Sequence, residues 1–450
     1  MSKIFETSFP YYLIRKYGSF TFKRYYGEYI VIGKENIPTD YPVIFAPNHT
    51  NALMDALAVL SVLPSTLPVV FLARADMFNN KPAARWLEFC KIMPAFRMRD
   101  GVENLGKNSE IFDTCVDVLH QNKALAIMPE GNQETERRLR PLLKGIFRIA
   151  FAAQQKYGDK PGVKIVPVGL DFGDSIKSHK HIIITFGKPI EVSDYMNQYT
   201  ENSVAATNQI KERLKNDLIH ISLHLDSDNY YDCFETATEI CNTQYVTKLG
   251  LPNKTEYRFV ARQRIASRLI EIEENEPEKI KLLDKLCSNY NEALTELKLK
   301  NWAFEQAPHD KFQMVSDFLL LFSTSTFYVL GLLLNFLPFF IPVYLRKKVF
   351  KTEFTGFFSS LQFALGMLTF PVFYSLQTIL FYCLTPFPWW ASVAFLLLQY
   401  PLGKWALRWN SIAKKLGAKL RFNRLCKIMP DKIAQIQELN DQIIQLVLQQ

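Results

Sequence analysis

The sequence predicts an α/β fold, a mixed sheet flanked by helices, followed by a C-terminal helical membrane region. Two observations carry this prediction. Between residues 29 and 190, short β-rich apolar runs alternate with stretches of helical periodicity. In the C-terminal third, two long stretches contain no charged residue, which is typical of segments buried in a lipid bilayer. The chain of 450 residues is long enough to hold a large core and additional elements.

The predicted strands are short, and helices separate most of them. The strands are expected at residues 29–32, 43–46, 69–73, 124–128, 164–170 and 181–187. The helices are expected at residues 52–62, 83–90, 104–120 and 145–157. This alternation favours a sheet with helices on its faces.

Five parts are expected along the chain. Residues 1–35 mix tyrosine and phenylalanine with lysine and arginine, which suits an interfacial amphipathic segment; a helix packed on its own domain is the alternative. The α/β domain is expected at 36–200, a helical connector at 201–315, and the membrane region at 316–404, with two to four membrane-embedded helical segments. Residues 405–450 form a C-terminal amphipathic helix, whose apolar stripe indicates a packing or self-association face and hence a homo-oligomer as one option.

The uncharged stretches, residues 318–345 and 354–403, exceed the length of about 20 residues that one span needs. Residues 385–390 (Thr-Pro-Phe-Pro-Trp-Trp) are expected to divide the second stretch into two spans. Basic clusters follow both stretches and are expected in the cytoplasm, so a re-entrant path is favoured for the first stretch and three ordinary spans are the alternative. The residues expected to break its helix are Gly331, Asn335, Pro338 and Pro342.

The chain carries a formal net charge of +9. Its basic residues are interleaved with apolar segments, which favours anionic lipid over nucleic acid as the partner. The sequence has neither the Cys/His spacing of a zinc site nor a nucleic-acid-binding signature. We therefore expect no metal and no nucleic acid, and we expect the seven scattered cysteines to be reduced thiols.

A histidine and an aspartate follow the apolar run at residues 43–46, where a strand is expected to pass into a helix. His49 and Asp55 would therefore lie at the mouth of the sheet, where α/β folds place ligands. An imidazole held by a carboxylate can take a proton from an alcohol, which is general-base catalysis. No serine or cysteine lies beside His49 in a nucleophile-elbow context, so direct attack by the acceptor is favoured. From the pair alone, a structural role is the alternative.

The chain resembles the glycerophospholipid acyltransferase family, the lysophosphatidate and glycerol-phosphate acyltransferases, in four blocks that occur in the family's order. The blocks are residues 48–55, 92–101, 127–132 with 143–145 and Ala150, and 165–169. Five residues separate His49 from Asp55 where the family usually has four, which resembles the glycerol-phosphate and dihydroxyacetone-phosphate branch. The third block lacks the family's Thr and Arg after its Glu-Gly. Basic residues further along could supply that charge: Arg137, Arg138, Arg140 and Lys144.

The resemblance implies a catalytic pair, His49 and Asp55, and a set of substrate-binding residues. In an extended strand Arg97 and Arg99 would share one face and clamp a phosphate. Gly131 allows close approach of backbone N–H groups to phosphate or an oxyanion. By resemblance Glu130 helps to hold the acceptor, and Pro167 lines the cleft; from the residue alone Pro167 would end or edge a strand. The full substrate-binding set is Asn48, Arg97, Arg99, Glu130, Gly131, Lys144 and Pro167.

The resemblance further implies a membrane-bound O-acyltransferase that moves a fatty acyl group from acyl-CoA or acyl-acyl-carrier protein to glycerol 3-phosphate. The thioester is a co-substrate, and no cofactor is expected. Lysophosphatidate is an alternative acceptor, and dihydroxyacetone phosphate is a third. A non-catalytic lipid-binding scaffold with a degenerate acyltransferase domain is the alternative from another class. A transporter is disfavoured, because the uncharged stretches contain no Asp, Glu, Lys, Arg or His to mark a substrate path. We expect an integral membrane protein whose catalytic domain faces the cytoplasm.

Overall fold

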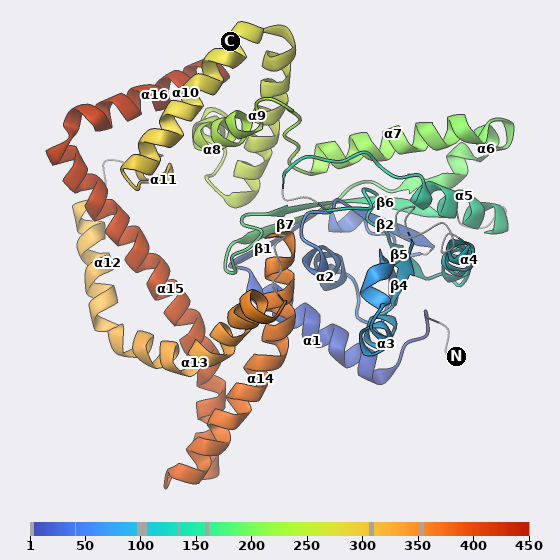
Figure 1. Cartoon of the computed structure of the whole chain (residues 1–450), viewed down its shortest axis with the longest axis horizontal. Coiled ribbons are helices and arrows are strands. Elements are labelled where there is room, and N and C mark those ends of the chain that lie inside the picture. The colour runs from blue at the N-terminus through green and yellow to red at the C-terminus, as the bar shows by residue number, and fades with distance from the viewer. Residues whose placement is uncertain are drawn as a thin grey trace. The chain divides into compact units, whose positions relative to one another are not determined.

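The computed structural model describes residues 4–40, 42–96, 106–133, 136–157, 162–305, 310–350 and 355–449. The chain divides into two compact units, whose elements are labelled in Figure 1. The first unit comprises Met1–His224 and Phe354–Ser360, and the second comprises Leu225–Glu353 and Leu361–Gln450. Each unit has a buried apolar core of its own.

The first unit contains the sheet. Its strands are β1 (Glu28–Ile32), β2 (Val43–Pro47), β3 (Val69–Arg74), β4 (Ile92–Ala95), β5 (Ala124–Ala126), β6 (Lys164–Phe172), β7 (His181–Phe186) and β8 (Ile190–Glu191). Its helices are α1 (Phe9–Tyr25), α2 (Leu53–Val62), α3 (Lys81–Phe89), α4 (Lys107–His120), α5 (Gly145–Tyr157), α6 (Met196–Glu201) and α7 (Ser203–Ile221), with short 3₁₀ turns at Lys34–Asn36, Ala75–Phe78, Val192–Tyr195 and Thr355–Phe357. Every strand and helix predicted in this region is present.

The sheet has the strand order β1-β7-β6-β2-β5-β3-β4, and β8 pairs with β6. Strands β2, β5, β3 and β4 are parallel neighbours, and β2 is also parallel to β6. Strand β6 is antiparallel to β7 and β8, so the sheet is mixed. The predicted fold class, a mixed sheet flanked by helices, is confirmed. All four parallel neighbours end at the same edge, and this edge positions the site.

Helices cover both faces of the sheet, as the alternation of side chains along β2 requires. Ile44 and Ala46 join a buried cluster that includes residues of α4, α5 and α7. Phe45 points to the opposite face, and its ring lies 6.2 Å from that of Phe186. The first helix packs on α2, as Figure 1 shows, with Tyr11 and Phe22 buried. The alternative of a helix packed on its own domain therefore applies to α1, and lipid contact through its exposed side stays a prediction.

The second unit is helical in its described residues. Its helices are α8 (Tyr231–Lys248), α9 (Thr255–Asn275), α10 (Pro277–Glu296), α11 (Trp302–Glu305), α12 (Lys311–Ser323), α13 (Ser325–Leu345), most of α14 (Phe358–Leu384), α15 (Trp389–Ile428) and α16 (Pro430–Leu448), with a π-helical turn at Arg346–Phe350. Helix α14 ends at Leu384 and α15 begins at Trp389, so a break lies within residues 385–390 as predicted. Of the two parts that it separates, the first, within Thr355–Leu384, is a candidate membrane span among the described residues, and the division into two spans stays a prediction. Helix α15 runs through residue 404 without interruption, where the membrane region was expected to end.

The apolar stripe of α16 is a packing face inside the second unit. Ile433, Ile436, Ile443 and Val447 are buried, and α16 packs against α8 and α10. Self-association through this helix would have to use its other faces, because these four side chains are already covered.

The break predicted within residues 318–345 is in the wrong place. Helix α13 is continuous through Gly331, Asn335, Pro338 and Pro342, and the interruption falls at Thr324, between α12 and α13. Prolines inside a helix remove hydrogen bonds, so their tolerance here needs a physical reason.

Helix α14 supplies that reason, because its side chains satisfy the carbonyls that the two prolines leave free. Pro338 cannot donate to the Leu334 carbonyl, which instead accepts from Nε2 of Gln377 at 2.9 Å. Pro342 likewise cannot donate to the Pro338 carbonyl, which instead accepts from Oγ1 of Thr369 at 2.8 Å. A helix can pass through prolines where neighbouring helices satisfy the freed backbone groups.

Candidate functional site

The site begins where two neighbouring parallel strands end. Asn48 and His49 directly follow β2, and Glu130 lies four residues beyond β5. Because β2 and β5 are parallel and paired, both segments leave the sheet at the same edge. The structure therefore brings His49, Asp55 and Glu130 together, as expected from their positions.

His49 and Asp55 form a hydrogen-bonded pair. The distance between Nδ1 of His49 and Oδ2 of Asp55 is 2.9 Å. The Asp55 side chain is fully buried, whereas 19% of the His49 side chain is exposed. A carboxylate at Nδ1 fixes the tautomer that carries the proton there, which leaves Nε2 free to accept one. This arrangement is that of a general base oriented by a carboxylate.

Asp55 also holds the loop that carries the histidine. It is the third residue of α2, and its Oδ2 accepts from the backbone N–H of Thr50 at 3.0 Å and of Asn51 at 2.7 Å. A carboxylate in the first turn of a helix satisfies free N–H groups and is stabilised by the helix dipole. Ala52, which lies between Asn51 and Asp55 in the chain, has φ 45° and ψ −116°. This conformation costs a non-glycine residue about 1–3 kcal/mol. The loop is strained, and the surrounding contacts hold it.

Glu130 is buried and supports the backbone of the site. Its Oε1 accepts from the backbone N–H of His49 at 2.7 Å, and its Oε2 accepts from that of Arg140 at 2.8 Å. Desolvation by burial raises the pKa of Glu130 to about 7, against the opposing effect of these two hydrogen bonds. Its carboxyl thus ties the loop after β5 to the loop after β2. Its contact with His49 is a hydrogen bond to the backbone N–H of that residue.

This raised pKa predicts a pH-dependent stability that Glu130→Gln removes. The folded-state pKa exceeds the unfolded value of 4.5, so the stabilisation is fully present below pH 4.5 and is lost as the pH rises through about 7. Between pH 4.5 and 8 the wild type should lose up to about 3 kcal/mol of unfolding free energy relative to the variant. Thermal unfolding of both proteins across this range measures the difference. Parallel curves for the two proteins would contradict the raised pKa.

Two residues of the predicted substrate-binding set lie in the sheet framework. The Asn48 side chain donates to the Leu170 carbonyl at 3.2 Å and accepts from the Leu170 N–H at 2.6 Å, so it extends the pairing of β2 with β6. Pro167 lies buried inside β6, opposite Ala46, and does not end or edge the strand as the residue alone suggested. It is tolerated because β6 pairs with β8 before it and with β7 after it, and no ladder partner needs its missing N–H.

Gly131 and Lys144 lie at the turn beside Glu130. The Gly131 N–H donates to the Met128 carbonyl at 3.1 Å, and its φ of +66° favours glycine. A Cβ at this position would lie 2.2 Å from Cδ1 of Leu143, so the turn and the segment before α5 are in direct contact. Lys144 follows Leu143 and is exposed, so its ammonium group can reach solvent on this side of the turn.

Arg97 and Arg99 lie outside the described residues, beyond the end of β4. Of the other basic residues named above, Arg137 is engaged: its Nε lies 3.5 Å from Oδ1 of Asp171, and its guanidinium donates to the Phe172 carbonyl at 2.9 Å. Oδ2 of Asp171 lies 3.3 Å from Nε2 of His181. The site region thus contains a second His–Asp pair, which the sequence alone did not reveal because its members lie on antiparallel strands.

Asn51 is a further residue that sequence analysis missed. It is 1% exposed, and hydrogen bonds join it to Ser359 and Ser360, some 310 residues further along the chain. No local pattern could have revealed a contact over such a separation.

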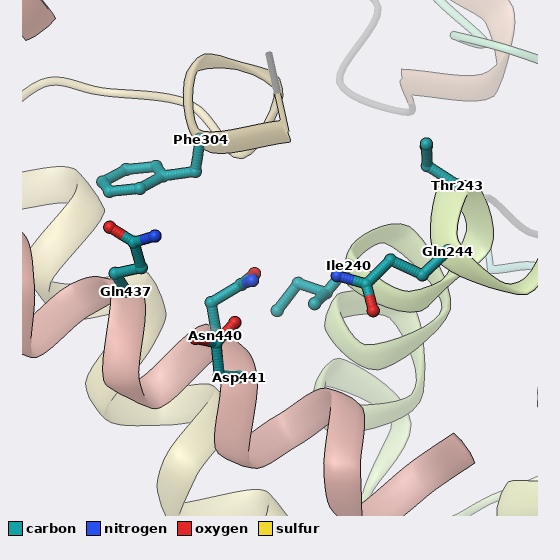
Figure 2. A pocket seen from close by; sticks show the side chains of 7 residues that line it. All are labelled: Ile240, Thr243, Gln244, Phe304, Gln437, Asn440 and Asp441. Atoms are coloured by element: carbon teal, nitrogen blue, oxygen red, sulfur yellow. The ribbon is translucent and has the colours of Figure 1, made fainter. Parts of the chain in front are cut away.

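A cavity in the second unit shares no lining residue with this site. Its lining side chains come from α8, α11 and α16, as Figure 2 shows, and include Phe304, Gln437 and Asp441. None of the candidate catalytic residues lines it. Among the described residues, no group of three or more His, Cys, Asp or Glu side chains is arranged to hold a metal ion.

Comparisons with known proteins found relatives of part of this chain. The family model described as acyltransferase matches residues 28–171. The chain is 27% identical to glycerol-3-phosphate O-acyltransferase 1 of Saccharomyces cerevisiae over 202 residues, which is 44% of this chain and 25% of that protein. It is 25% identical to glycerol-3-phosphate O-acyltransferase 2 of the same yeast over 294 residues, which is 61% of this chain and 38% of that protein. The matches thus span well under half of the length of these curated relatives.

A solved structure was also found. The crystal structure of the 1-acyl-sn-glycerophosphate (LPA) acyltransferase PlsC from Thermotoga maritima aligns with a TM-score of 0.32 and 18% sequence identity. The alignment covers 45% of this chain and 78% of that chain.

Proposed function

We propose that this chain, which belongs to the glycerophospholipid acyltransferase family through its acyltransferase domain, transfers a fatty acyl group from a thioester to the hydroxyl of glycerol 3-phosphate. The observation that carries the proposal is the His49–Asp55 pair at the carboxyl edge of the sheet, inside the region that matches the family model. The names of the two yeast relatives favour glycerol 3-phosphate as acceptor. Lysophosphatidate is the second candidate acceptor.

The reaction needs one base and no acyl-enzyme. Nε2 of His49 takes the proton of the acceptor hydroxyl while the oxygen attacks the thioester carbonyl. The tetrahedral oxyanion then collapses, the carbon–sulfur bond breaks, and the thiolate receives the proton from the imidazolium. Asp55 stabilises the imidazolium between these two steps. Glu130, through the His49 N–H, keeps the loop in the position that this transfer requires.

Acyl-CoA or acyl-acyl-carrier protein is the proposed donor, and the proposed setting is a membrane. Helical segments Ser325–Phe350 and Thr355–Leu384 are long and apolar enough to cross a bilayer, and only 17% and 6% of their most apolar windows are buried. An apolar helix of a soluble core would be mostly covered, so lipid is the natural environment of these segments. The acyltransferase domain would face the cytoplasm, where thioester donors are available.

The test is a radiolabelled acyl-transfer assay on purified protein in lipid, with glycerol 3-phosphate and lysophosphatidate offered separately and each thioester supplied in turn. Transfer to glycerol 3-phosphate with a kcat/KM at least tenfold above that for lysophosphatidate supports the proposal. The reverse preference would reassign the acceptor. No transfer to either acceptor would leave dihydroxyacetone phosphate as the acceptor or the non-catalytic scaffold as the function, and the same assay with dihydroxyacetone phosphate separates these two.

Arg97→Ala should raise the KM for the phosphorylated acceptor by about 10–100-fold, because a hydrogen-bonded charge pair with a phosphate contributes on the order of 1.5–3 kcal/mol. The KM for the thioester should stay within about twofold, since the interaction is with the acceptor alone. Steady-state kinetics with each substrate varied in turn measure both constants. Arg213→Ala, which removes a helix-surface arginine paired with Asp217, is the control. Equal changes in the two KM values would rule out an acceptor-specific role.

A further inference from the structure

Asn51 lies in the loop between β2 and α2, residues 48–52, which carries His49 and is called the catalytic loop below. Its N–H donates to Asp55, and its side-chain Nδ2 donates to the Ser175 carbonyl at 3.1 Å. Its side-chain Oδ1 accepts from Oγ of Ser359 at 2.7 Å, and its backbone carbonyl accepts from Oγ of Ser360 at 3.0 Å. Every polar atom of this buried residue is therefore engaged.

The two serines lie at the start of an apolar helix. Ser359 and Ser360 are in the first turn of α14, both are buried, and the segment Phe354–Ser360 belongs to the first unit. The same helix continues into the second unit as a candidate membrane span. A segment outside the matched acyltransferase region thus contributes two of the hydrogen bonds that hold the loop between His49 and Asp55.

These bonds act at the strained point of the loop. Asn51 directly precedes Ala52, whose positive φ persists only if neighbouring groups hold it there. Without the serine hydroxyls, the peptide between these residues can relax toward an ordinary conformation. The Asn51 N–H would then leave Asp55, and the carboxylate would no longer be held toward His49. Small displacements of this kind matter, because a shift of about 1 Å at a reacting group can cost about 10²-fold in rate.

We infer that Ser359 and Ser360 are positioning residues for the acyl transfer, and that the first turn of α14 completes the catalytic loop. This inference rests on the proposed function. It assigns α14 a role in catalysis beyond that of an anchor. It also implies that residues 28–171, which match the family model, are insufficient for full activity without α14.

The test compares the double variant Ser359→Ala/Ser360→Ala with the wild type, using the full chain in lipid. We expect kcat to fall by about 10–100-fold, with both KM values within about twofold. The melting temperature should fall by only a few degrees, because the buried Oδ1 of Asn51 loses its donor while the fold is otherwise retained. Ser392→Ala is the matched control: Ser392 is also a buried serine of an apolar helix, but its hydroxyl has no hydrogen-bond partner among the described residues. Its kcat should equal that of the wild type.

Hydrogen–deuterium exchange of a peptide covering residues 48–55 is the second measurement. The amides of Thr50 and Asn51, which Asp55 now protects, should exchange at least tenfold faster in the double variant and at the wild-type rate in Ser392→Ala. A kcat and an exchange rate both equal to those of the control would overturn the inference. So would a loss of activity that matches the loss of folded protein. If the wild type transferred no acyl group, the proposed function would fail, and the exchange rates alone would decide whether the serines hold the loop.

Discussion

Replacing His49 with alanine is expected to lower kcat for acyl transfer by about 10²–10⁴-fold, because the acceptor hydroxyl loses its general base. The partly exposed side chain leaves no large buried cavity, so folding and insertion should be retained. Acyl-transfer kinetics on purified protein, normalised to folded protein by size-exclusion chromatography, measure the effect.

The second His–Asp pair provides a matched control for this variant. His181→Ala removes an imidazole that also faces a buried aspartate, and its kcat should stay within about threefold of the wild type. More than half of wild-type turnover in His49→Ala would contradict the assignment of the base. A large loss in His181→Ala alone would move the base to His181.

Replacing Asp55 has the second large expected effect, and two substitutions separate its causes. Asp55→Asn preserves the volume and removes the charge that orients the imidazole and stabilises its protonated form. In a comparable His–Asp pair of a serine protease, this change lowered kcat by about 10⁴-fold. Asp55→Ala also leaves three donors without an acceptor, and one of them, the Asn51 N–H, is fully buried, so it should cost about 3–5 kcal/mol of unfolding free energy in addition.

Kinetics and thermal unfolding on the same preparations separate the two effects. Asp55→Asn should remain folded and nearly inactive, while Asp55→Ala should be both inactive and less stable. Retention of more than a tenth of wild-type kcat by Asp55→Asn would show that Asp55 serves only the fold.

The sheet and the His–Asp pair could be predicted because both depend on short-range patterns. The run that became β2 is apolar along its length, and the run that became β6 is apolar from Ile165 to Leu170, as is typical of strands covered on both faces. His49 and Asp55 lie six positions apart across the end of a strand and the start of a helix, so the fold of this short segment brings them together. The roles of these residues in catalysis stay predictions.

Long-range pairing is what the sequence could not reveal. Ser359 reaches Asn51 only because α14 starts inside the first unit, and Asp171 meets His181 only because β6 and β7 are antiparallel. Pro167 was misjudged for the same reason: its place between two partner strands of β6 is a property of the sheet order. The continuity of α13 depends likewise on side chains of α14. The prolines within α13 therefore could not show by themselves that the helix continues through them.

The prolines of α13 also constrain the biogenesis of a chain seated in a bilayer as proposed. Alone in the hydrocarbon, α13 would present the unpaired carbonyls of Leu334 and Pro338, and each unpaired group costs several kcal/mol there. The donors on Gln377 and Thr369 follow α13 in the chain, so they emerge from the ribosome after it. Helix α13 should therefore remain at the insertion machinery until α14 has emerged, and the two helices should enter the lipid as a pair.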